Sequence, residues 1–253
     1  MKKILILFLF ILLSDRAMAK DKLEISFFHI PPHIFYNSET GQISGAMYEF
    51  LNHDIAPVMD VEFVWDKTPA NVPRQLLMLE EEKRDAAAVL IYTPERSEEF
   101  AYSQTPFSKA KSVIAVLNGS RIKNIVQPDD LLGMKIGYAA RTFLSPFMRD
   151  KRLKFEFISS GEPNEQNLKK LKAGRVDCIY IPDKAGLLME IKNLKMEKEV
   201  RLIELPEKAS PMHVVFSKLN LSYAKKYDKA FHKINGEAVY MKRLEKYLDV
   251  SKL

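Results

Sequence analysis

The side chains that could do acid–base chemistry are spread along this chain of 253 residues. His29, Glu39 and Asp183 lie in loops at the ends of predicted strands, but their spacing points to no reaction. The sequence contains no GxSxG or HExxH motif, and Cys178 lies inside an apolar run. We therefore expect a protein without enzymatic activity.

The sequence does not indicate a metal or cofactor site either. A single cysteine excludes an intramolecular disulfide and a zinc site built on several thiolates. His29 and His33 are four residues apart, but Pro31-Pro32 between them excludes the helix that would place both on one metal. No GxGxxG or GxxxxGK[ST] motif is present to hold phosphates. We expect no cofactor and no metal.

Short apolar runs that are typical of strands recur along the chain. Most are apolar throughout, as expected for strands covered on both faces of a parallel or mixed sheet. They cover residues 23–28, 61–65, 86–91, 112–117, 135–138, 154–158, 177–181, 201–205 and 213–216.

Segments with helical spacing of apolar residues lie between these runs. They cover residues 47–58, 72–79, 168–171 and 223–234, and Gly174 and Gly236 are suited to end the last two. Such alternation of strands and helices predicts an α/β fold.

The alternation is interrupted twice, at residues 105–128 and at 206–211. A chain that leaves one lobe, builds a second and returns has two such crossings. We therefore predict a discontinuous first lobe, residues 20–109 and 211–253, and a second lobe, residues 110–210. Ligands of open α/β sheets bind beyond the carboxyl ends of the strands, so a cleft is expected between the lobes.

The first 19 residues resemble a secretory signal peptide. A basic start, Met1-Lys2-Lys3, precedes an apolar run at 4–13 and the small-x-small sequence Ala17-Met18-Ala19. The run is shorter than the roughly 20 residues that cross a bilayer. We expect cleavage after Ala19 and a periplasmic protein that is not embedded in the membrane.

The charges of the chain do not indicate a nucleic-acid partner. Without residues 1–19, 36 basic and 32 acidic residues remain, a net charge of +4. Lysines and glutamates are intermixed, as at 190–199, whereas nucleic-acid-binding proteins carry a basic stripe. We expect a monomer whose partner is a small molecule.

Four motifs in order resemble the bacterial periplasmic solute-binding proteins with the type II fold, family 3, which includes the polar amino-acid binders. Each motif alone is weak, but together they cover nearly the whole chain after residue 19. They are Pro31-Pro32-His33-Ile34-Phe35-Tyr36 followed by 39–45, Asp85-Ala86-Ala87-Ala88 with Thr93-Pro94-Glu95-Arg96, the segment 130–137, and the segment 171–177. The resemblance implies two α/β lobes joined by two hinge strands.

The resemblance also implies roles for cleft residues. Arg96 matches the arginine that receives the ligand carboxylate, for which a planar, permanently charged guanidinium is suited. The alternative is an exposed arginine paired with neighbouring glutamates. Thr142 matches a hydroxyl at a helix start that binds the same carboxylate, and it could also cap a helix at 143–149. Arg141 stands where the family usually has glycine, so a second guanidinium could face the cleft or the solvent.

Two positions depart from the family pattern. Ile91 stands where many amino-acid binders have a serine. The acidic residue that usually holds the ligand's amino group aligns with Pro182, and Asp183 comes one step late. Asp183 could reach the cleft through a strand bulge, or it could cap the helix that follows.

Aromatic and imidazole side chains complete the candidate site. Trp65, the single tryptophan, follows a strand where the family often lines its pocket, or else it belongs to the core. His29, with Ile30, could line the wall of the cleft.

Three functions are compatible with the sequence. The first is capture of a small anionic or zwitterionic solute, an amino acid or related organic acid, for an inner-membrane ABC permease. The second is an accessory or sensor protein that binds the same solute without a transporter. The third is a periplasmic dehydratase of cyclic carboxylates, a chemistry that the fold also hosts but that no constellation of residues indicates here.

Overall fold

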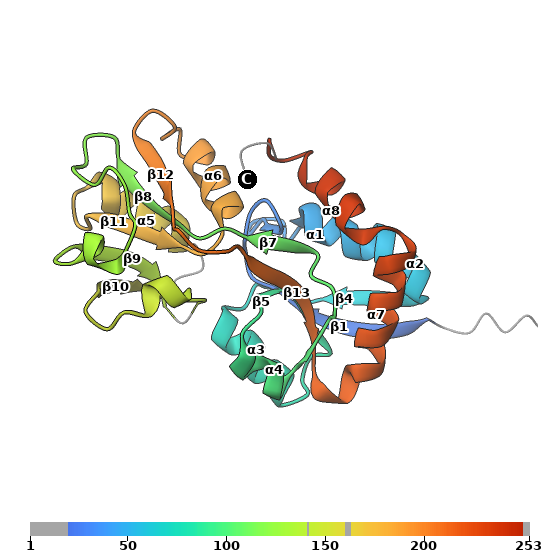
Figure 1. The fold of residues 1–253 in the computed structure, drawn as a ribbon. Coiled ribbons are helices and arrows are strands. Elements are labelled where there is room, and N and C mark those ends of the chain that lie inside the picture. Colours follow the sequence, from blue (N-terminus) through green and yellow to red (C-terminus); the bar gives the residue numbers. More distant parts are fainter. Residues whose placement is uncertain (1–19, 141, 160–162, 250–253) are drawn as a thin grey trace, which may run out of the picture.

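The computed structural model describes residues 20–140, 142–159 and 163–249. The predicted signal peptide and Arg141 lie outside this part of the chain. Within it, most strands belong to two separate sheets, which form two lobes placed side by side (Figure 1).

The first lobe is built on a sheet with the strand order β4-β1-β5-β13-β6, and β7 pairs with β13. β1, β4 and β5 run parallel, whereas β13 is antiparallel to β5. The strands of this lobe, including the hairpin of β2 and β3, are β1 (Asp21–Ser26), β2 (Phe35–Tyr36), β3 (Ile43–Ser44), β4 (Val61–Trp65), β5 (Ala86–Ile91), β6 (Ala101–Tyr102), β7 (Ser108–Ala110) and β13 (Ser210–Phe216).

The second lobe has the strand order β10-β9-β11-β8-β12. β9, β10 and β11 run parallel, and β8 is antiparallel to both of its neighbours. The strands are β8 (Val113–Leu117), β9 (Lys135–Ala139), β10 (Lys154–Ile158), β11 (Cys178–Ile181) and β12 (Val200–Glu204).

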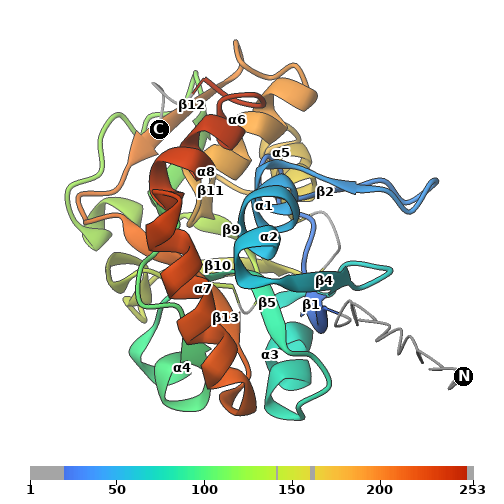
Figure 2. The same ribbon diagram turned by 90° about the vertical axis from the view of Figure 1, so that its right-hand side faces the viewer.

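Helices cover both faces of the first sheet. Figure 2 shows α1, α2, α7 and α8 together on one face, and α3 and α4 lie on the other side of the lobe. The helical segments are α1 (Ala46–Glu49), the π-helical turn η1 (Phe50–Ile55), α2 (Ala56–Met59), α3 (Val72–Glu80), α4 (Pro94–Glu99), the 3₁₀ turn η4 (Lys218–Asn220), α7 (Leu221–Lys233) and α8 (Gly236–Leu244).

On the second sheet, two long helices pack on one face and short turns lie over the other. Its two long helices are α5 (Pro163–Lys172) and α6 (Lys184–Asn193), and two 3₁₀ turns are η2 (Pro128–Leu131) and η3 (Pro146–Arg149). No helix within the described ranges is long and apolar enough to cross a membrane.

The two chain crossings between the lobes lie side by side. β7 pairs with β13 immediately before the first crossing and after the second, with Ala110 opposite Ser210. Between the strands, the Leu205 N–H donates to the Ser112 carbonyl at 3.2 Å, and the Lys111 ammonium donates to the Leu205 carbonyl at 3.1 Å. Each crossing therefore supports the other with hydrogen bonds.

Burial on both faces explains why the strands are apolar throughout. In β5, Ala86 and Ala88 belong to one core cluster, whereas Ala87 and Leu90 belong to the cluster on the opposite face. β8 divides its residues between two clusters in the same alternating way. Successive side chains of a strand point to opposite faces, so both sets must be apolar.

The structure confirms the predicted α/β alternation and corrects it in one place. Each of the nine predicted runs overlaps a strand, and Val61–Trp65, Ala86–Ile91 and Lys154–Ile158 have the predicted bounds. The helix predicted at 143–149 is wrong, because only Pro146–Arg149 forms a single 3₁₀ turn. Proline fixes φ and favours a first helical position, so this turn begins at Pro146 rather than earlier.

Candidate functional site

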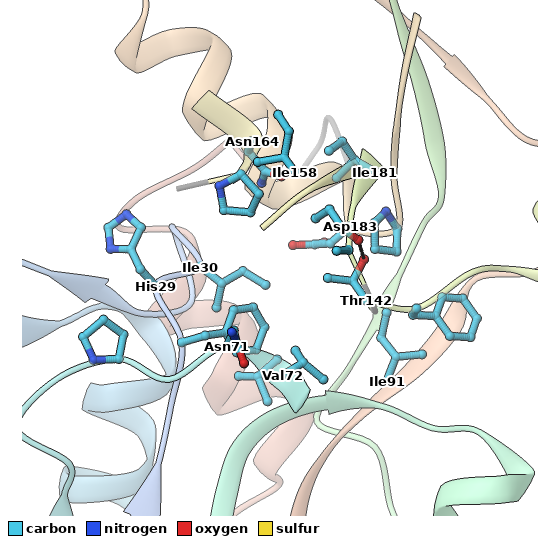
Figure 3. Close-up of a pocket in the computed structure, with 18 of the residues that line it drawn as sticks. His29, Ile30, Asn71, Val72, Ile91, Thr142, Ile158, Asn164, Ile181 and Asp183 are labelled. Atoms are coloured by element: carbon cyan, nitrogen blue, oxygen red, sulfur yellow. Dashed lines mark hydrogen bonds between the residues drawn. The ribbon is translucent and has the colours of Figure 1, made fainter. Parts of the chain in front are cut away.

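A cavity of about 700 Å³ lies between the two lobes. Its walls come from segments that follow the carboxyl ends of the parallel strands β1, β5, β9, β10 and β11. This is where open α/β sheets bind their ligands. In Figure 3, Ile30, Val72 and Ile91 of the first lobe face Ile158 and Ile181 of the second.

Both lobes contribute many residues to the lining, and most of these residues are apolar. The first lobe contributes Phe28, His29, Ile30, Pro31, Pro69, Ala70, Asn71, Val72, Pro73, Val89, Leu90, Ile91, Arg96 and Met212. The second contributes Ala139, Ala140, Thr142, Phe143, Ile158, Ser159, Pro163, Asn164, Glu165, Tyr180, Ile181, Pro182, Asp183, Glu190, Asn193 and Leu194.

Arg96 lines this cavity and is half-buried. It lies in the first turn of α4, whose N-cap Thr93 accepts a hydrogen bond from the Arg96 N–H at 3.2 Å. The guanidinium donates to the Ile91 carbonyl at 3.3 Å. Among the described residues, no carboxylate oxygen lies within ion-pair distance of it, and Glu95 pairs instead with Arg149 at 3.8 Å. The alternative of an arginine paired with its neighbours is therefore not what the structure shows.

Tyrosine hydroxyls from both lobes lie near the Arg96 guanidinium. Burial raises the pKa of Tyr102 to about 12, and the nearby positive charge of Arg96 opposes this rise. Burial likewise raises the pKa of Tyr138, on β9 of the second lobe, to about 12, again against the charge of Arg96. Both hydroxyls stay protonated at neutral pH, so neither neutralises the guanidinium.

Thr142 lines the cavity but does not cap a helix. Its hydroxyl donates to the Ala139 carbonyl at 3.0 Å, and its own carbonyl accepts from the Tyr138 hydroxyl at 2.7 Å. The predicted helix start is wrong here, because the residues after Thr142 do not continue as a helix. Because the hydroxyl donates its proton to Ala139, its oxygen can still accept a hydrogen bond at the cavity wall.

Asp183 caps α6, which is the second of the two alternatives for this residue. Its carboxylate accepts hydrogen bonds from the N–H groups of Ala185 at 3.2 Å and Gly186 at 3.0 Å. It also accepts from the imidazole Nε2 of His33, in the other lobe, at 3.1 Å. Burial raises the pKa of Asp183, but the charge and hydrogen bond of His33 and the two N–H groups outweigh it, and the pKa lies below its ordinary value.

His29 and Ile91 lie in the cavity wall as predicted, with their polar groups engaged. The His29 Nδ1 accepts the Tyr36 N–H at 3.1 Å. Burial lowers the pKa of His29, and Glu165 of the other lobe opposes this. The Ile91 carbonyl accepts from Arg96 and from the Tyr102 hydroxyl, each at 3.3 Å.

Trp65 does not line the interlobe cavity. It ends β4, the edge strand of the first sheet, and its ring packs against Phe27 and Tyr48 with centroids 5.8 and 5.1 Å away. Its indole N–H donates to the Asn52 side chain at 3.2 Å. The ring also borders a separate, smaller cavity. Trp65 lies on the edge strand, two strands from β5, whose end lines the cavity. Its ring therefore packs beside the core of the first lobe and not in the cleft.

Several lining residues were not predicted from the sequence. Asn71 caps α3, where its side chain accepts the Arg74 N–H at 3.0 Å, and Val72 follows it into the cavity. The sequence Asn71-Val72-Pro73 is a typical helix start and could have marked this wall. Asn164 and Phe143 gave no comparable signal. Within the described ranges, no three His, Cys, Asp or Glu side chains are grouped so as to hold a metal ion.

The model of the bacterial extracellular solute-binding proteins, family 3, matches residues 28–250. A search of curated proteins found no match to this chain.

Solved structures of similar fold cover most of the chain. An ancestral arginine-binding protein bound to arginine has a TM-score of 0.76 and 22% identity, over 91% of this chain and 100% of that one. An amino acid ABC transporter substrate-binding protein from Streptococcus pneumoniae, bound to L-arginine, has a TM-score of 0.75 and 20% identity, over 89% and 94%.

A third structure is described as an ancestral amino acid-binding protein that is a precursor of cyclohexadienyl dehydratase. Its TM-score is 0.72 and its identity 17%, over 90% of this chain and 95% of that one. At these identities the likeness shows the fold. Two lobes, paired crossings, a cavity between them and the family match agree: the chain belongs to the bacterial extracellular solute-binding proteins, family 3, and has their two-lobed fold.

Proposed function

We propose that the protein binds a small solute carrying a carboxylate in the interlobe cavity. The observation that carries this proposal is the half-buried guanidinium of Arg96 at the cavity wall, without a carboxylate partner among the described residues. A partly desolvated guanidinium favours an anionic ligand, and its planar fork matches a carboxylate. The surrounding walls are mostly apolar, which suits a ligand with an apolar body.

Closure of the lobes is part of this proposal. We propose that residues 20–109 with 211–253 and residues 110–210 move about the two paired crossings. Since both lobes line the cavity, a ligand that contacts both stabilises the closed arrangement. Thr142 would contact the solute from the second lobe, opposite Arg96.

We further propose that the mature protein begins after Ala19, acts in the periplasm and delivers its solute to an inner-membrane ABC permease. The amino acid ABC transporter substrate-binding protein from Streptococcus pneumoniae, which has a similar fold, supports this role. An accessory protein that reports the solute to a sensor would use the same cavity. Uptake of the solute by a permease only when this protein is present would distinguish the transport role from the sensor role.

Arg96→Ala tests the binding site. A thermal-shift screen with amino acids, dicarboxylates and aromatic acids identifies a ligand, whose affinity is then measured by isothermal titration calorimetry. Removing one partner of a buried charged pair costs about 2–5 kcal/mol, so the affinity should fall at least about thirtyfold. Arg121→Ala, at an exposed position outside the cavity lining, should keep the affinity. An unchanged affinity of the Arg96 variant would remove Arg96 from the site.

We propose that the protein acts by binding and not by catalysis. The imidazole of His29 and the carboxylate of Asp183 are both engaged in hydrogen bonds within the protein. Because one structure of similar fold is a dehydratase precursor, the purified protein should be incubated with a cyclic carboxylate such as prephenate. We expect no loss of substrate, and turnover would contradict the proposal.

A further inference from the structure

An amino acid bound in a closed cavity needs an acceptor for its ammonium group as well as a cation for its carboxylate. We propose that the solute carries no ammonium group, and that His33 determines this specificity by occupying Asp183 from the opposite lobe. The solute class is a carboxylic acid with an apolar body. This inference rests on the proposed carboxylate-binding function and refines it.

The acceptor capacity of Asp183 is largely used within the protein. One oxygen accepts from the Ala185 N–H, and the other accepts from the Gly186 N–H and from His33. The side chain is 8% exposed, so little of it faces the cavity that it borders. An incoming ammonium would have to displace one of these donors.

His33 reaches Asp183 from the first lobe and cannot easily move away. Its side chain is 1% exposed, and its Nδ1 is hydrogen-bonded to the hydroxyl of Tyr240 on α8. The ionised carboxylate can only accept, so the Nε2 of His33 carries the proton of this hydrogen bond. The imidazole thus fills the place of a cationic or donor group of the ligand.

The backbone around His33 is equally fixed. The His33 carbonyl accepts from the Met47 N–H at 2.8 Å, and the Pro32 carbonyl accepts from the Ala46 N–H at 3.1 Å. On the other side of the contact, a Cβ on Gly186 would lie 3.1 Å from the Pro31 carbonyl oxygen. The loop of the first lobe and the start of α6 therefore meet closely across the lobes.

The remaining cavity wall favours an apolar body. Ile30, Val72, Ile91, Phe143, Ile158 and Ile181 line it from both lobes. Two other carboxylates, Glu165 and Glu190, also line the cavity, but each has an interaction partner of its own, which for Glu165 includes Lys169. Among the described lining residues, Arg96 contributes the positive charge for a ligand.

The experiment compares amino acids with the same molecules lacking the amino group. Affinities are measured by calorimetry for phenylalanine and 3-phenylpropanoate, leucine and 4-methylpentanoate, and glutamate and glutarate. We expect at least one of the first two deaminated acids to bind, and each deaminated acid that binds to do so at least about tenfold more tightly than its amino acid. Tighter binding of the amino acids would overturn this inference and leave carboxylate binding intact, whereas binding of no member of any pair would contradict both.

Variants of His33 test the cause of this preference. His33→Ala releases Asp183 and should shift the affinity ratio toward the amino acid by at least about tenfold. His33→Gln keeps an N–H donor toward Asp183 and should restore the preference of the native protein. Each ratio is measured on one variant, so a partly unfolded sample does not change it. An unchanged ratio in His33→Ala would show that His33 does not determine the specificity.

Discussion

Arg96 and Asp183 hold similar places in the two lobes, yet their charges have different uses. Each lies where a strand leads into a helix, after β5 and β11 respectively. In α4 the N-cap is the neutral Thr93, so the charge of Arg96 stays available at the cavity wall. In α6 the N-cap is Asp183 itself, and helix N–H groups and His33 take up its charge. Arg96 lies three residues after the N-cap of its helix and Asp183 is the N-cap, so only the charge of Asp183 is used by its own helix.

His213 gives a prediction at the same scale. Its ring is 5% exposed between Tyr92 and Tyr102, and burial lowers its pKa to about 4, which a hydrogen bond with Ser103 only partly opposes. Between pH 6.5 and 4 the unfolded chain binds a proton that the folded protein does not. The free energy of unfolding is therefore not reduced by His213 above pH 6.5. It falls by about 3 kcal/mol as the pH falls from 6.5 to 4.

Urea unfolding of the native protein and of His213→Asn across this pH range measures the effect. The variant should lose less stability on acidification than the native protein. The matched control is His53→Asn, whose exposed side chain is hydrated in both states and which should follow the native curve. A curve for His213→Asn that parallels the native one would contradict the prediction.

At the scale of elements, the start of α1 depends on Gly45. Its φ is +115°, and a Cβ there would lie 2.6 Å from the His33 carbonyl oxygen. Both the backbone conformation and this close approach require glycine. Gly45→Ala should therefore lower the free energy of unfolding by more than about 2 kcal/mol, measured by denaturant titration.

Gly119→Ala provides the control for Gly45. This glycine has no atom within 4 Å of an added Cβ, and its φ lies outside the left-handed region. Its stability should change by no more than about 0.5 kcal/mol. Equal effects of the two substitutions would show that the contact with His33 does not constrain the element.

At the scale of the whole molecule, ligand binding should stabilise both lobes together. A ligand that binds only the folded state at 100 times its Kd adds about 2.7 kcal/mol to the free energy of unfolding. The increase should appear in one transition by calorimetry, because the cavity draws on both lobes. In Arg96→Ala the same ligand concentration should add much less, and an equal increase would place binding elsewhere.

The sequence alone was sufficient to predict the nine longer strands, because both faces of each sheet are covered and most of these runs are therefore apolar throughout. It also predicted the order of two lobes from the two interruptions of the alternation. It missed the hairpin of β2 and β3 and the short strands β6 and β7, which have only two or three residues each. Elements of that length carry no periodicity of their own.

The resemblance to the family placed Arg96, Thr142 and Ile91 near a cleft, and the position of His29 at a strand end suggested the same place. The structure brings these four residues to one cavity. The partnership of His33, Asp183 and Tyr240 lies beyond such reasoning, since 150 residues separate the first two and 207 separate His33 from Tyr240. Capping and burial patterns are local properties of the chain, whereas contacts across the lobes depend on how the two crossings orient them. The sequence thus determined which groups stand at the strand ends, and only the tertiary structure decided which of them are left for a solute.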